Sequence, residues 1–336
     1  MTVEYGPQFT VADMNGSVSD PRVVVVTGSS GGIGAAAARL LARRGDRVVV
    51  VGRSPDRTRA VAAELGADGH VADFAHLGQV RDLAAELERR YPRIDVLINN
   101  AGLIAPGRRA VTADGHELTF QVNHLAPFLL TALLRGPLSA ARARVIITSS
   151  RAGAARDATV NVADLDMTDG YDSLRAYKAS KLANVLFTRE LARRWGHLGV
   201  SAAAVHPGMV RSQWGRGGPP AVRAVMNSPL RLALRSPERG ADTIVWLATS
   251  VPDQDWPSGG YFADRKPATP SPLAGDAELA GRLWDTSASM CGLPGAAEVI
   301  GGSSVLDIIG PATSAGSKES TSYGDTNYPG QDFCSG

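Results

Sequence analysis

Short apolar runs alternate along the chain with longer segments in which apolar and charged residues recur at helical spacing. From residue 22 onward the short runs are rich in β-branched residues, which is typical of strands buried on both faces of a parallel sheet. The longer segments place apolar residues three or four positions apart, as amphipathic helices do. We therefore expect strands and helices to alternate from residue 22 to about residue 293.

The alternation predicts a specific order of elements. Strands are expected at Val23–Thr27, Val48–Val51, a short segment ending near Asp73, Ile94–Ile98, Arg144–Thr148, Val200–Val205 and Tyr261–Phe262. Helices are expected at Ala35–Arg44, Pro55–Leu65, Leu77–Arg90, Leu118–Leu134, 172–195, Pro237–Thr249 and Asp276–Met290. This order predicts an α/β fold in a single domain: a Rossmann-type, doubly wound parallel sheet with helices on both faces.

Three segments depart from this rhythm. Residues 1–20 mix Gly, Pro, Asn, Ser and Asp, and are expected to form a flexible lead-in to a domain spanning 21–293. Residues 294–336 are rich in Gly, Ser and Thr, which predicts a disordered tail. Residues 209–236 are rich in Pro, Gly and Arg, and include Met209 and Trp214. We interpret them as a lid over a substrate site.

Composition narrows the class of protein. Apolar residues make up 44% of the 336 residues, and the net charge is +2, which argues against a nucleic-acid-binding surface. Two cysteines suit a reducing compartment, and no apolar run reaches the roughly 18 residues of a membrane span. We expect a cytoplasmic protein without a transmembrane segment. The six histidines show no metal-ligand spacing, so no metal is expected.

A glycine-rich turn lies between the first strand and the first helix. Gly28 permits a tight turn, Gly32 lets the backbone approach a pyrophosphate, and Gly34 lets helix and strand pack closely. The helix N-terminus then offers free N–H groups and a positive dipole end to phosphate. The turn predicts a dinucleotide site, with Ser30 and Ile33 also among its cofactor-binding residues.

The end of the second strand indicates which dinucleotide binds. An acid there would bond to the ribose 2′-hydroxyl of NAD, but this chain has Arg53 and no acid. A guanidinium at this position pairs with a 2′-phosphate, which favours NADP(H) over NAD(H). Arg57 or Arg59 are alternatives for the same role, and a solvated surface arginine is the simpler interpretation of Arg53.

The ends of the third and fourth strands add further candidates. Asp73 is placed to accept from the adenine amine, and a helix cap is an equally good interpretation of this residue. Asn99, Ala101 and Gly102 end the fourth strand, where ligands bind in such sheets. The small residues would admit the cofactor's ribose, and Asn99 is expected to bridge neighbouring backbone groups.

Tyr177 and Lys181 lie four residues apart near the start of a predicted helix, so they share one face of it. A nearby ammonium group favours the phenolate and lowers the pKa of the phenol. Proton transfer works best when the pKa of the donor lies near the working pH. Taken alone the pair is a weak signal, because an ordinary helix with a packed tyrosine and a solvated lysine has the same spacing.

Together these motifs closely resemble those of the short-chain dehydrogenase/reductase family, from about Arg22 to Leu293. The resemblance is carried by the glycine turn, the Asn99–Gly102 segment, the Ser149–Ser150 pair and Tyr177-x-x-x-Lys181. Residues 122–128, 180–184, 206–210 and 258–262 resemble the retinol-dehydrogenase-like branch. These motifs are specific for fold and reaction class but poorly specific for substrate.

The resemblance implies a role for each member of the site. Tyr177 is the general acid in reduction and the base in oxidation, and Lys181 lowers its pKa and bonds to the nicotinamide ribose. Ser150 donates to the substrate oxygen, because the family's catalytic serine is usually followed by a short small-residue stretch, here residues 151–153. Successive strand residues point to opposite faces, so only one serine can face the site, and Ser149 is the alternative. Pro207, Gly208, Val210 and Ser212 are implied to lie beside the nicotinamide and its carboxamide.

Asn123 is the remaining catalytic candidate that the resemblance implies, and the sequence adds its own argument. Pro127 follows four residues later and has no N–H to donate to the carbonyl of Asn123, so the helix is expected to kink there. A buried free carbonyl needs a partner, and water is the obvious one. Such a water would connect Lys181 to solvent and re-protonate Tyr177.

The sequence thus predicts an NADP(H)-dependent oxidoreductase acting on a carbonyl or secondary alcohol of a bulky, mainly apolar substrate. Retinoid-like and polyketide-like compounds both fit. A nucleotide-sugar epimerase or dehydratase is disfavoured because the turn spacing is Gly-x-x-x-Gly-x-Gly and few residues follow the fold. A non-catalytic dinucleotide sensor is disfavoured because the tyrosine and the lysine are both kept. A homodimer, formed through the helices near 118–134 and 172–195, is a further expectation from the resemblance.

Overall fold

The computed structural model describes residues 20–105, 107–211, 228 and 234–294. The chain divides into two units, Met1–Ile300 and Gly301–Gly336, and all described residues belong to the first. The predicted lead-in and tail therefore lie outside the described residues, except at residues 20 and 294. Most of the predicted lid also lies outside them, including Ser212 and Trp214.

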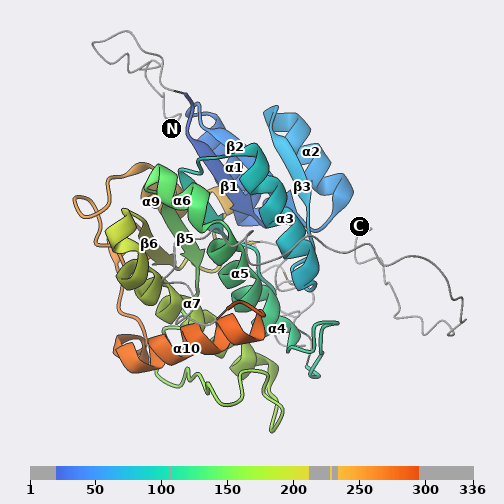
Figure 1. Ribbon diagram of the computed structural model, residues 1–336, viewed down its shortest axis with the longest axis vertical. Helices are drawn as coiled ribbons and strands as arrows, with labels where there is room; N and C mark the ends of the chain where they lie inside the picture. Colours follow the sequence, from blue (N-terminus) through green and yellow to red (C-terminus); the bar gives the residue numbers. More distant parts are fainter. Residues whose placement is uncertain (1–19, 106, 212–227, 229–233, 295–336) are drawn as a thin grey trace, which may run out of the picture. The chain divides into compact units, whose positions relative to one another are not determined.

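The centre of the fold is one eight-stranded sheet in the order β3-β2-β1-β4-β5-β6-β7-β8 (Figure 1). All neighbouring strands pair in parallel except β7 and β8, which are antiparallel. The strands are β1 Val23–Thr27, β2 Arg47–Gly52, β3 Asp68–Val71, β4 Val96–Asn99, β5 Arg144–Thr148, β6 Ser201–Val205, β7 Gly260–Ala263 and β8 Lys266–Pro267. The reversal of strand order between β1 and β4 confirms the doubly wound parallel sheet.

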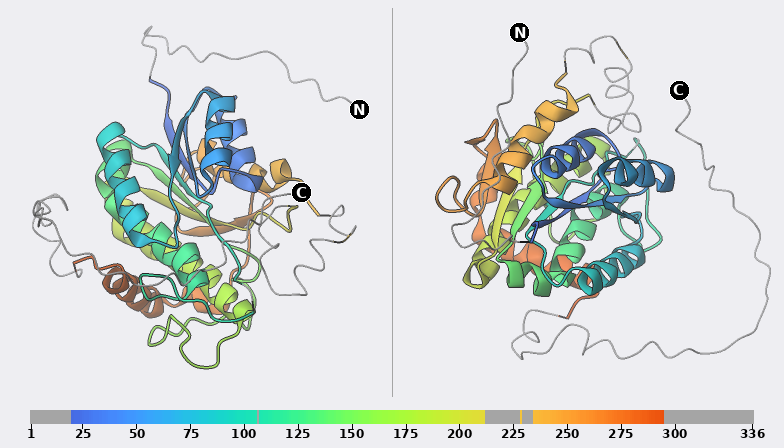
Figure 2. Two further views of the ribbon diagram at one scale, coloured as in Figure 1. Left: turned by 90° about the vertical axis from the view of Figure 1, so that its right-hand side faces the viewer. Right: turned by 90° about the horizontal axis from the view of Figure 1, so that it is seen from above.

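Helices cover both faces of this sheet (Figure 2). One face carries α1 Gly32–Ala42, α2 Pro55–Leu65 and α9 Pro237–Thr249. The other carries α3 Leu77–Arg90, α5 Ala126–Leu133, α6 Arg135–Ala141 and α7 Ser173–Trp195, with α10 Ala277–Met290 packed against α7. The short elements are α4 Leu118–Phe120, the π-helical turn η1 Gln121–Leu125, and the 3₁₀ turns η2 Gly196–Leu198 and η5 Pro272–Gly275.

Alternation along each strand separates the two cores. Val24 and Val26 pack with α1 and α9, whereas Val25 between them packs with the helices of the opposite face. All three side chains are fully buried. The β-branched runs are continuous in the sequence because both faces of a parallel strand are covered.

Two local features differ from the sequence prediction. The hairpin to β8 was not predicted, because its turn residues Asp264 and Arg265 both have positive φ, a conformation usually taken by Gly or Asn. The third strand ends at Val71, two residues before Asp73. Among the described residues, no helix is both long and apolar enough to span a membrane.

Candidate active site

The glycine turn between β1 and α1 packs closely against the chain that follows β4. A Cβ on Gly28 (φ +65°) would lie 2.8 Å from the Cα of Ala101, and one on Gly34 would lie 2.4 Å from the carbonyl oxygen of Gly28. The first turn of α1 begins after Gly31 and has no side-chain cap, so its N–H groups stay available. The turn therefore fits the pyrophosphate of a dinucleotide.

Thr27 and Asn100 hold the turn and the end of β4 together. The buried Thr27 hydroxyl accepts from the backbone N–H groups of Asn100 (3.0 Å) and Ala101 (3.1 Å). The side-chain amide of Asn100 donates to the carbonyl of Thr27 at 3.0 Å. The prediction that Asn99 bridges backbone groups is wrong: its amide points to the other face and donates to Thr131 Oγ1 at 2.9 Å. Strand alternation gives the bridging role to Asn100.

Arg53 is exposed at the end of β2, and it forms no hydrogen bond or ion pair within the described part of the chain. A Cβ on the preceding Gly52 would lie 2.7 Å from the Cβ of Ser30, so the Arg53 backbone follows directly on the glycine turn. The alternative Arg59 pairs with Asp56. Of these two arginines, Arg53 is therefore the one available to a ligand at the turn.

Asp73 is half-buried and forms a local turn. Its carboxylate accepts from the N–H of Ala75 at 3.0 Å, and its own N–H donates to the side chain of Gln79 at 2.9 Å. The helix-cap interpretation of Asp73 is therefore wrong: its Oδ1 closes a local turn, and the N-cap of the following helix α3 is His76. No hydrogen bond to Oδ2 is formed by the described residues, so that oxygen can still accept from a ligand.

The two serines that follow β5 have different neighbours. The Ser149 hydroxyl is buried and donates to the backbone carbonyl of Lys181 at 2.7 Å. Burial raises the pKa of the Tyr177 phenol, and the nearby Ser150 hydroxyl lowers it by a smaller amount. Gly153 lets this loop reach α7, because a Cβ there would lie 2.4 Å from the carbonyl carbon of Lys181. The geometry therefore brings Ser150, rather than Ser149, to Tyr177.

Lys181 and Tyr177 lie side by side near the start of α7. The Lys181 ammonium is 5.7 Å from the centre of the Tyr177 ring and donates to the carbonyl of Thr148 at 3.1 Å. Burial lowers the pKa of Lys181 to about 8. Burial also raises the pKa of Tyr177 above its ordinary value, against the lowering that we predicted. The prediction fails in this state because the ammonium faces the ring and the removal of the phenol from water dominates.

Asn123 lies in the π-helical turn, fully buried. Its side chain accepts from the N–H of Leu103 at 2.7 Å and donates to the carbonyl of Leu103 at 2.9 Å and to Ser180 Oγ at 3.0 Å. A Cβ on Gly102 would lie 3.0 Å from Asn123 Oδ1 and 3.3 Å from Lys181 Nζ, so both residues face that glycine.

The backbone around Asn123 departs from the prediction in two ways. The helix expected over 118–134 is interrupted by the π turn at 121–125, where a simple kink was predicted. The carbonyl of Asn123 was predicted to bond to water, but it accepts from the side-chain amide of Asn184 at 3.0 Å. One lone pair of that carbonyl is therefore used by the protein itself.

The segment after β6 packs beside the cofactor turn. Gly208 has φ +87°, and Pro207 is buried. A Cβ on Gly240 of α9 would lie 2.6 Å from a methyl group of Val210 and 3.2 Å from Ile33, so these two predicted cofactor residues meet at α9. Met209, at the start of the predicted lid, is 67% exposed.

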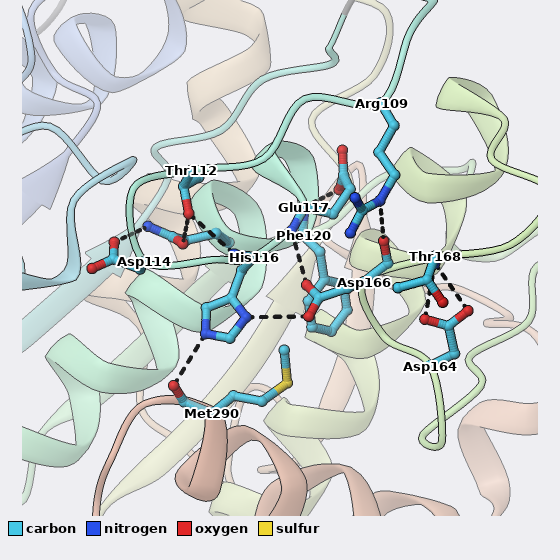
Figure 3. A network of polar contacts seen from close by, with 11 residues as sticks. Arg109, Thr112, Asp114, His116, Glu117, Phe120, Asp164, Asp166, Thr168 and Met290 are labelled. Atoms are coloured by element: carbon cyan, nitrogen blue, oxygen red, sulfur yellow. Dashed lines mark hydrogen bonds and ion pairs between the residues drawn. The ribbon is translucent and has the colours of Figure 1, made fainter.

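Polar contacts hold together the loops that flank the site, as Figure 3 shows. His116, in the loop before α4, lies between the carboxylate of Asp166 and the carbonyl of Met290, at 3.2 Å from each. Asp166 also accepts from the N–H of Glu117 at 2.8 Å, and its carbonyl accepts from Arg109 at 2.9 Å. These bonds join the β4–α4 loop, the β5–α7 loop and the end of α10.

A hollow of about 540 Å³ lies elsewhere, between α7 and the chain leading into β7. Arg189, Arg193 and residues 257–260 line it, at the amino end of β7. The predicted residues gather instead at the carboxyl ends of the strands, where doubly wound sheets bind ligands. Within the described ranges, no group of three or more His, Cys, Asp or Glu side chains is placed to hold a metal ion.

Three residues of the site were missed by sequence reasoning: Thr27, Asn100 and Asn184. Strand alternation at the end of β4 was the signal that pointed to Asn100 over Asn99. Thr27 was included only as the last residue of a strand and the first of the glycine turn, without a role for its hydroxyl. Asn184 follows Lys181 by three positions on the same face of α7, but its partners are distant in sequence.

Comparisons with known proteins agree with this geometry. The family model described as short chain dehydrogenase matches residues 22–217. The chain is 44% identical over 283 residues to "Putative daunorubicin C-13 ketoreductase DnrU" of Streptomyces sp. (strain C5), covering 81% of this chain and 93% of the relative. It is 39% identical over 293 residues to retinol dehydrogenase 14 of Mus musculus, covering 81% of this chain and 86% of the relative.

Solved structures resemble it as well. A crystal structure of an uncharacterised protein from Mycobacterium paratuberculosis has a TM-score of 0.63 at 32% identity, covering 82% of this chain and 96% of that one. A short chain dehydrogenase from Shigella flexneri complexed with NADP has a TM-score of 0.55 at 25% identity, covering 72% of this chain and 95% of that one. The chain belongs to the short-chain dehydrogenase/reductase family of nicotinamide-dependent oxidoreductases, and within it is retinol-dehydrogenase-like.

Proposed function

We propose that this protein is an NADP(H)-dependent oxidoreductase that transfers a hydride between the nicotinamide and a carbonyl or secondary alcohol of a bulky, mainly apolar compound. The observation that carries the proposal is the gathering of Ser150, Tyr177 and the buried ammonium of Lys181 at the end of β5, where Lys181 lies against the Tyr177 ring and donates to the carbonyl of Thr148. Relatives named for daunorubicin and for retinol support polyketide-like and retinoid-like substrates, respectively.

The bound cofactor would supply the hydride, and the protein would handle the proton. Tyr177 donates its phenolic proton to the substrate oxygen during reduction and takes it back during oxidation. Burial raises the pKa of Tyr177, but an alkoxide is a much stronger base than a phenolate, so donation remains downhill. Ser150 donates a hydrogen bond to the same oxygen and stabilises the charge that develops on it.

Lys181 and Asn123 would return the proton to Tyr177. With a pKa of about 8, Lys181 holds or releases a proton near neutral pH. The carbonyl of Asn123 keeps one lone pair beyond its bond from Asn184, and that lone pair suits the water of the predicted relay. The side chain of Asn123 fixes the carbonyl by its two bonds to Leu103.

Arg53 would select NADP(H). Its guanidinium is exposed beside the glycine turn and has no partner within the described residues, so a 2′-phosphate meets a cation that gives up no ion pair on binding. The NADP bound by the Shigella flexneri relative supports this preference. Pro207, Gly208 and Val210 would border the nicotinamide, since Val210 meets Ile33 of the cofactor turn.

A panel of ketones and aldehydes, supplied with NADPH or NADH, tests the proposal. Cofactor oxidation measured by absorbance should be fastest with polycyclic aromatic ketones or retinal, and faster with NADPH than with NADH. Tight NADPH binding without turnover of any carbonyl would instead indicate a dinucleotide sensor. Turnover of nucleotide sugars alone would indicate an epimerase or a dehydratase. Either result would overturn the proposal.

A further inference from the structure

Asn184 is a buried amide, 2% exposed, that lies three residues after Lys181 on α7. Its side-chain nitrogen donates to two backbone carbonyls, those of Asn123 (3.0 Å) and Thr148 (3.2 Å). An amide nitrogen carries two hydrogens, so both are used. This fixes the orientation of the amide and leaves its oxygen as an acceptor facing His124.

The first of these carbonyls has a specific need for a donor. In a regular helix the N–H of residue 127 would donate to the carbonyl of Asn123, but residue 127 is a proline. A carbonyl without a partner is costly at a buried position. Asn184 therefore supplies, from a different helix, the hydrogen that Pro127 lacks.

The second carbonyl is shared with the proposed catalytic lysine. Thr148 is the last residue of β5, and its carbonyl accepts from both Lys181 Nζ (3.1 Å) and Asn184 Nδ2 (3.2 Å). Because both donors bond to the same oxygen, the side-chain amide of Asn184 restricts where the Lys181 ammonium can lie. Asn184 thus links the carbonyl that holds the Lys181 ammonium to the carbonyl of Asn123.

His124 continues the network to α10. Its Nδ1 lies 3.3 Å from Asn184 Oδ1 and its Nε2 lies 2.9 Å from Ser287 Oγ, with both residues buried. Burial lowers the pKa of His124 to about 4, so the ring is neutral at pH 7 and carries one N–H. Because Asn184 Oδ1 can only accept, that hydrogen is on Nδ1, and Nε2 accepts from the Ser287 hydroxyl.

We propose that Asn184 is a positioning residue that sets the places of the Lys181 ammonium and the Asn123 carbonyl, and that α10 holds it in place through Ser287 and His124. This inference rests on the proposed function, because it assigns Lys181 a part in proton transfer. It explains why a helix distant in sequence from the reacting groups is joined to them by a chain of buried hydrogen bonds.

The titration of Lys181 measures this positioning directly. The chain contains only four lysines, Lys178, Lys181, Lys266 and Lys318, so ¹³C-lysine labelling gives few NMR signals. A Lys181→Met variant assigns the signal of interest, which should titrate near pH 8 in the parent. The measurement requires no substrate, so it remains decisive even if no carbonyl is turned over.

Two substitutions at Asn184 should move this titration in a graded way. Asn184→Ala removes a competing donor from the Thr148 carbonyl and opens space for water, so the pKa of Lys181 should rise toward its ordinary value. Asn184→Asp adds a carboxylate beside the ammonium and should raise the pKa further. In the alanine variant kcat should fall about tenfold with little change in KM, an effect comparable to one lost hydrogen bond.

Thr188→Val is the matched control, because Thr188 is equally buried on the next turn of α7 and donates to the backbone carbonyl of Asn184 at 2.7 Å. This variant should leave the Lys181 titration unchanged. If Asn184→Ala fails to fold, Ser287→Ala provides the second test, with a smaller shift in the same direction. An unchanged Lys181 titration in a folded Asn184→Ala variant, or in Ser287→Ala where that one is needed, would overturn the proposal.

Discussion

The face of the sheet covered by α1, α2 and α9 is packed with Val, Ala, Leu and Ile, whereas the face covered by α5, α7 and α10 also buries a set of polar side chains. On α1, α2 and α9 the buried polar residues are Thr58 and Thr243. On the opposite face, and around its π-helical turn, they include Gln121, Asn123, His124, Thr131, Ser180, Lys181, Asn184, Thr188, Glu190 and Ser287.

The difference separates two tasks. On an apolar face, every buried methyl group stabilises the folded state, and side chains of similar volume can replace one another. A buried polar network is stable only when each member has its partner, and it then fixes positions closely. The proposed reacting groups, Tyr177 and Lys181, lie on the polar face, where Lys181 and Asn184 of α7 both donate to the Thr148 carbonyl at the end of β5. Each prediction below perturbs one side of this comparison.

The largest effect is expected on the polar face, from loss of the phenol. Tyr177→Phe should lower kcat by about 10²- to 10⁴-fold, because the proton donor is removed while the ring still packs. NADPH binding, followed by fluorescence titration, should be nearly unchanged. Tyr91→Phe, which removes a phenol bonded to Asp68 at the edge of the sheet, is the control and should keep full activity. Similar kcat values in the two variants would contradict the role of Tyr177.

The apolar face should affect stability without affecting chemistry. Leu41 of α1 is fully buried, so Leu41→Ala should lower the free energy of unfolding by about 3 kcal/mol through lost contacts and a cavity. Urea unfolding measures the loss, and kcat per folded molecule should match the parent. Val71→Ala, at a side chain 48% exposed, should change stability by less than about 0.5 kcal/mol. A large loss of kcat in Leu41→Ala would contradict the assignment of stability to the apolar face and of catalysis to the polar face.

Acid should weaken the polar face. Burial lowers the pKa of His124 from 6.5 to about 4, so between these values the folded state binds fewer protons than the unfolded state. Stability is therefore highest above pH 6.5 and falls as the pH drops toward 4. This group alone should cost about 2 kcal/mol between pH 8 and pH 5. In His124→Gln, the free energy of unfolding measured with urea should depend less steeply on pH. An unchanged dependence would show that a group other than His124 causes the acid destabilisation.

The smallest effect is expected at the rim of the cofactor turn. Arg53→Ala should reduce the preference for NADPH over NADH by about tenfold, the effect of losing one charge-assisted contact to phosphate. Comparison of kcat/KM for the two cofactors measures this preference. Arg59→Ala is the control, since Arg59 already pairs with Asp56. An unchanged preference for NADPH over NADH in Arg53→Ala would show that another residue recognises the 2′-phosphate.

The same comparison shows what could be predicted from the sequence. The glycine turn and Tyr177-x-x-x-Lys181 are local patterns, so their placement at strand ends and on one helix face followed from spacing. The doubly wound parallel sheet followed from the alternation of strands and helices and the rules of parallel crossovers, but the order of its eight strands was not predicted. Asn99 was misassigned because a strand end was treated as one unit, although adjacent side chains point to opposite faces.

The rest depended on contacts between distant parts of the chain. Pro127 showed that the carbonyl of Asn123 would lack a helical donor, but no local pattern showed that Asn184 would supply it. The raised pKa of Tyr177 depends on burial, which only the packed structure reveals. The β7–β8 hairpin was hidden because a two-residue turn of Asp264 and Arg265 lacks the usual glycine.

The central claim is that the cofactor transfers a hydride, and Tyr177 a proton, to the same carbonyl group of the substrate. The direct test uses NADPH deuterated at the transferring C4 position with a polycyclic aromatic ketone, and mass spectrometry of the product. We predict an alcohol with deuterium on the former carbonyl carbon, formed by the parent and almost lost in Tyr177→Phe. Cofactor oxidation without a deuterated alcohol, or equal product from the two proteins, would contradict the account.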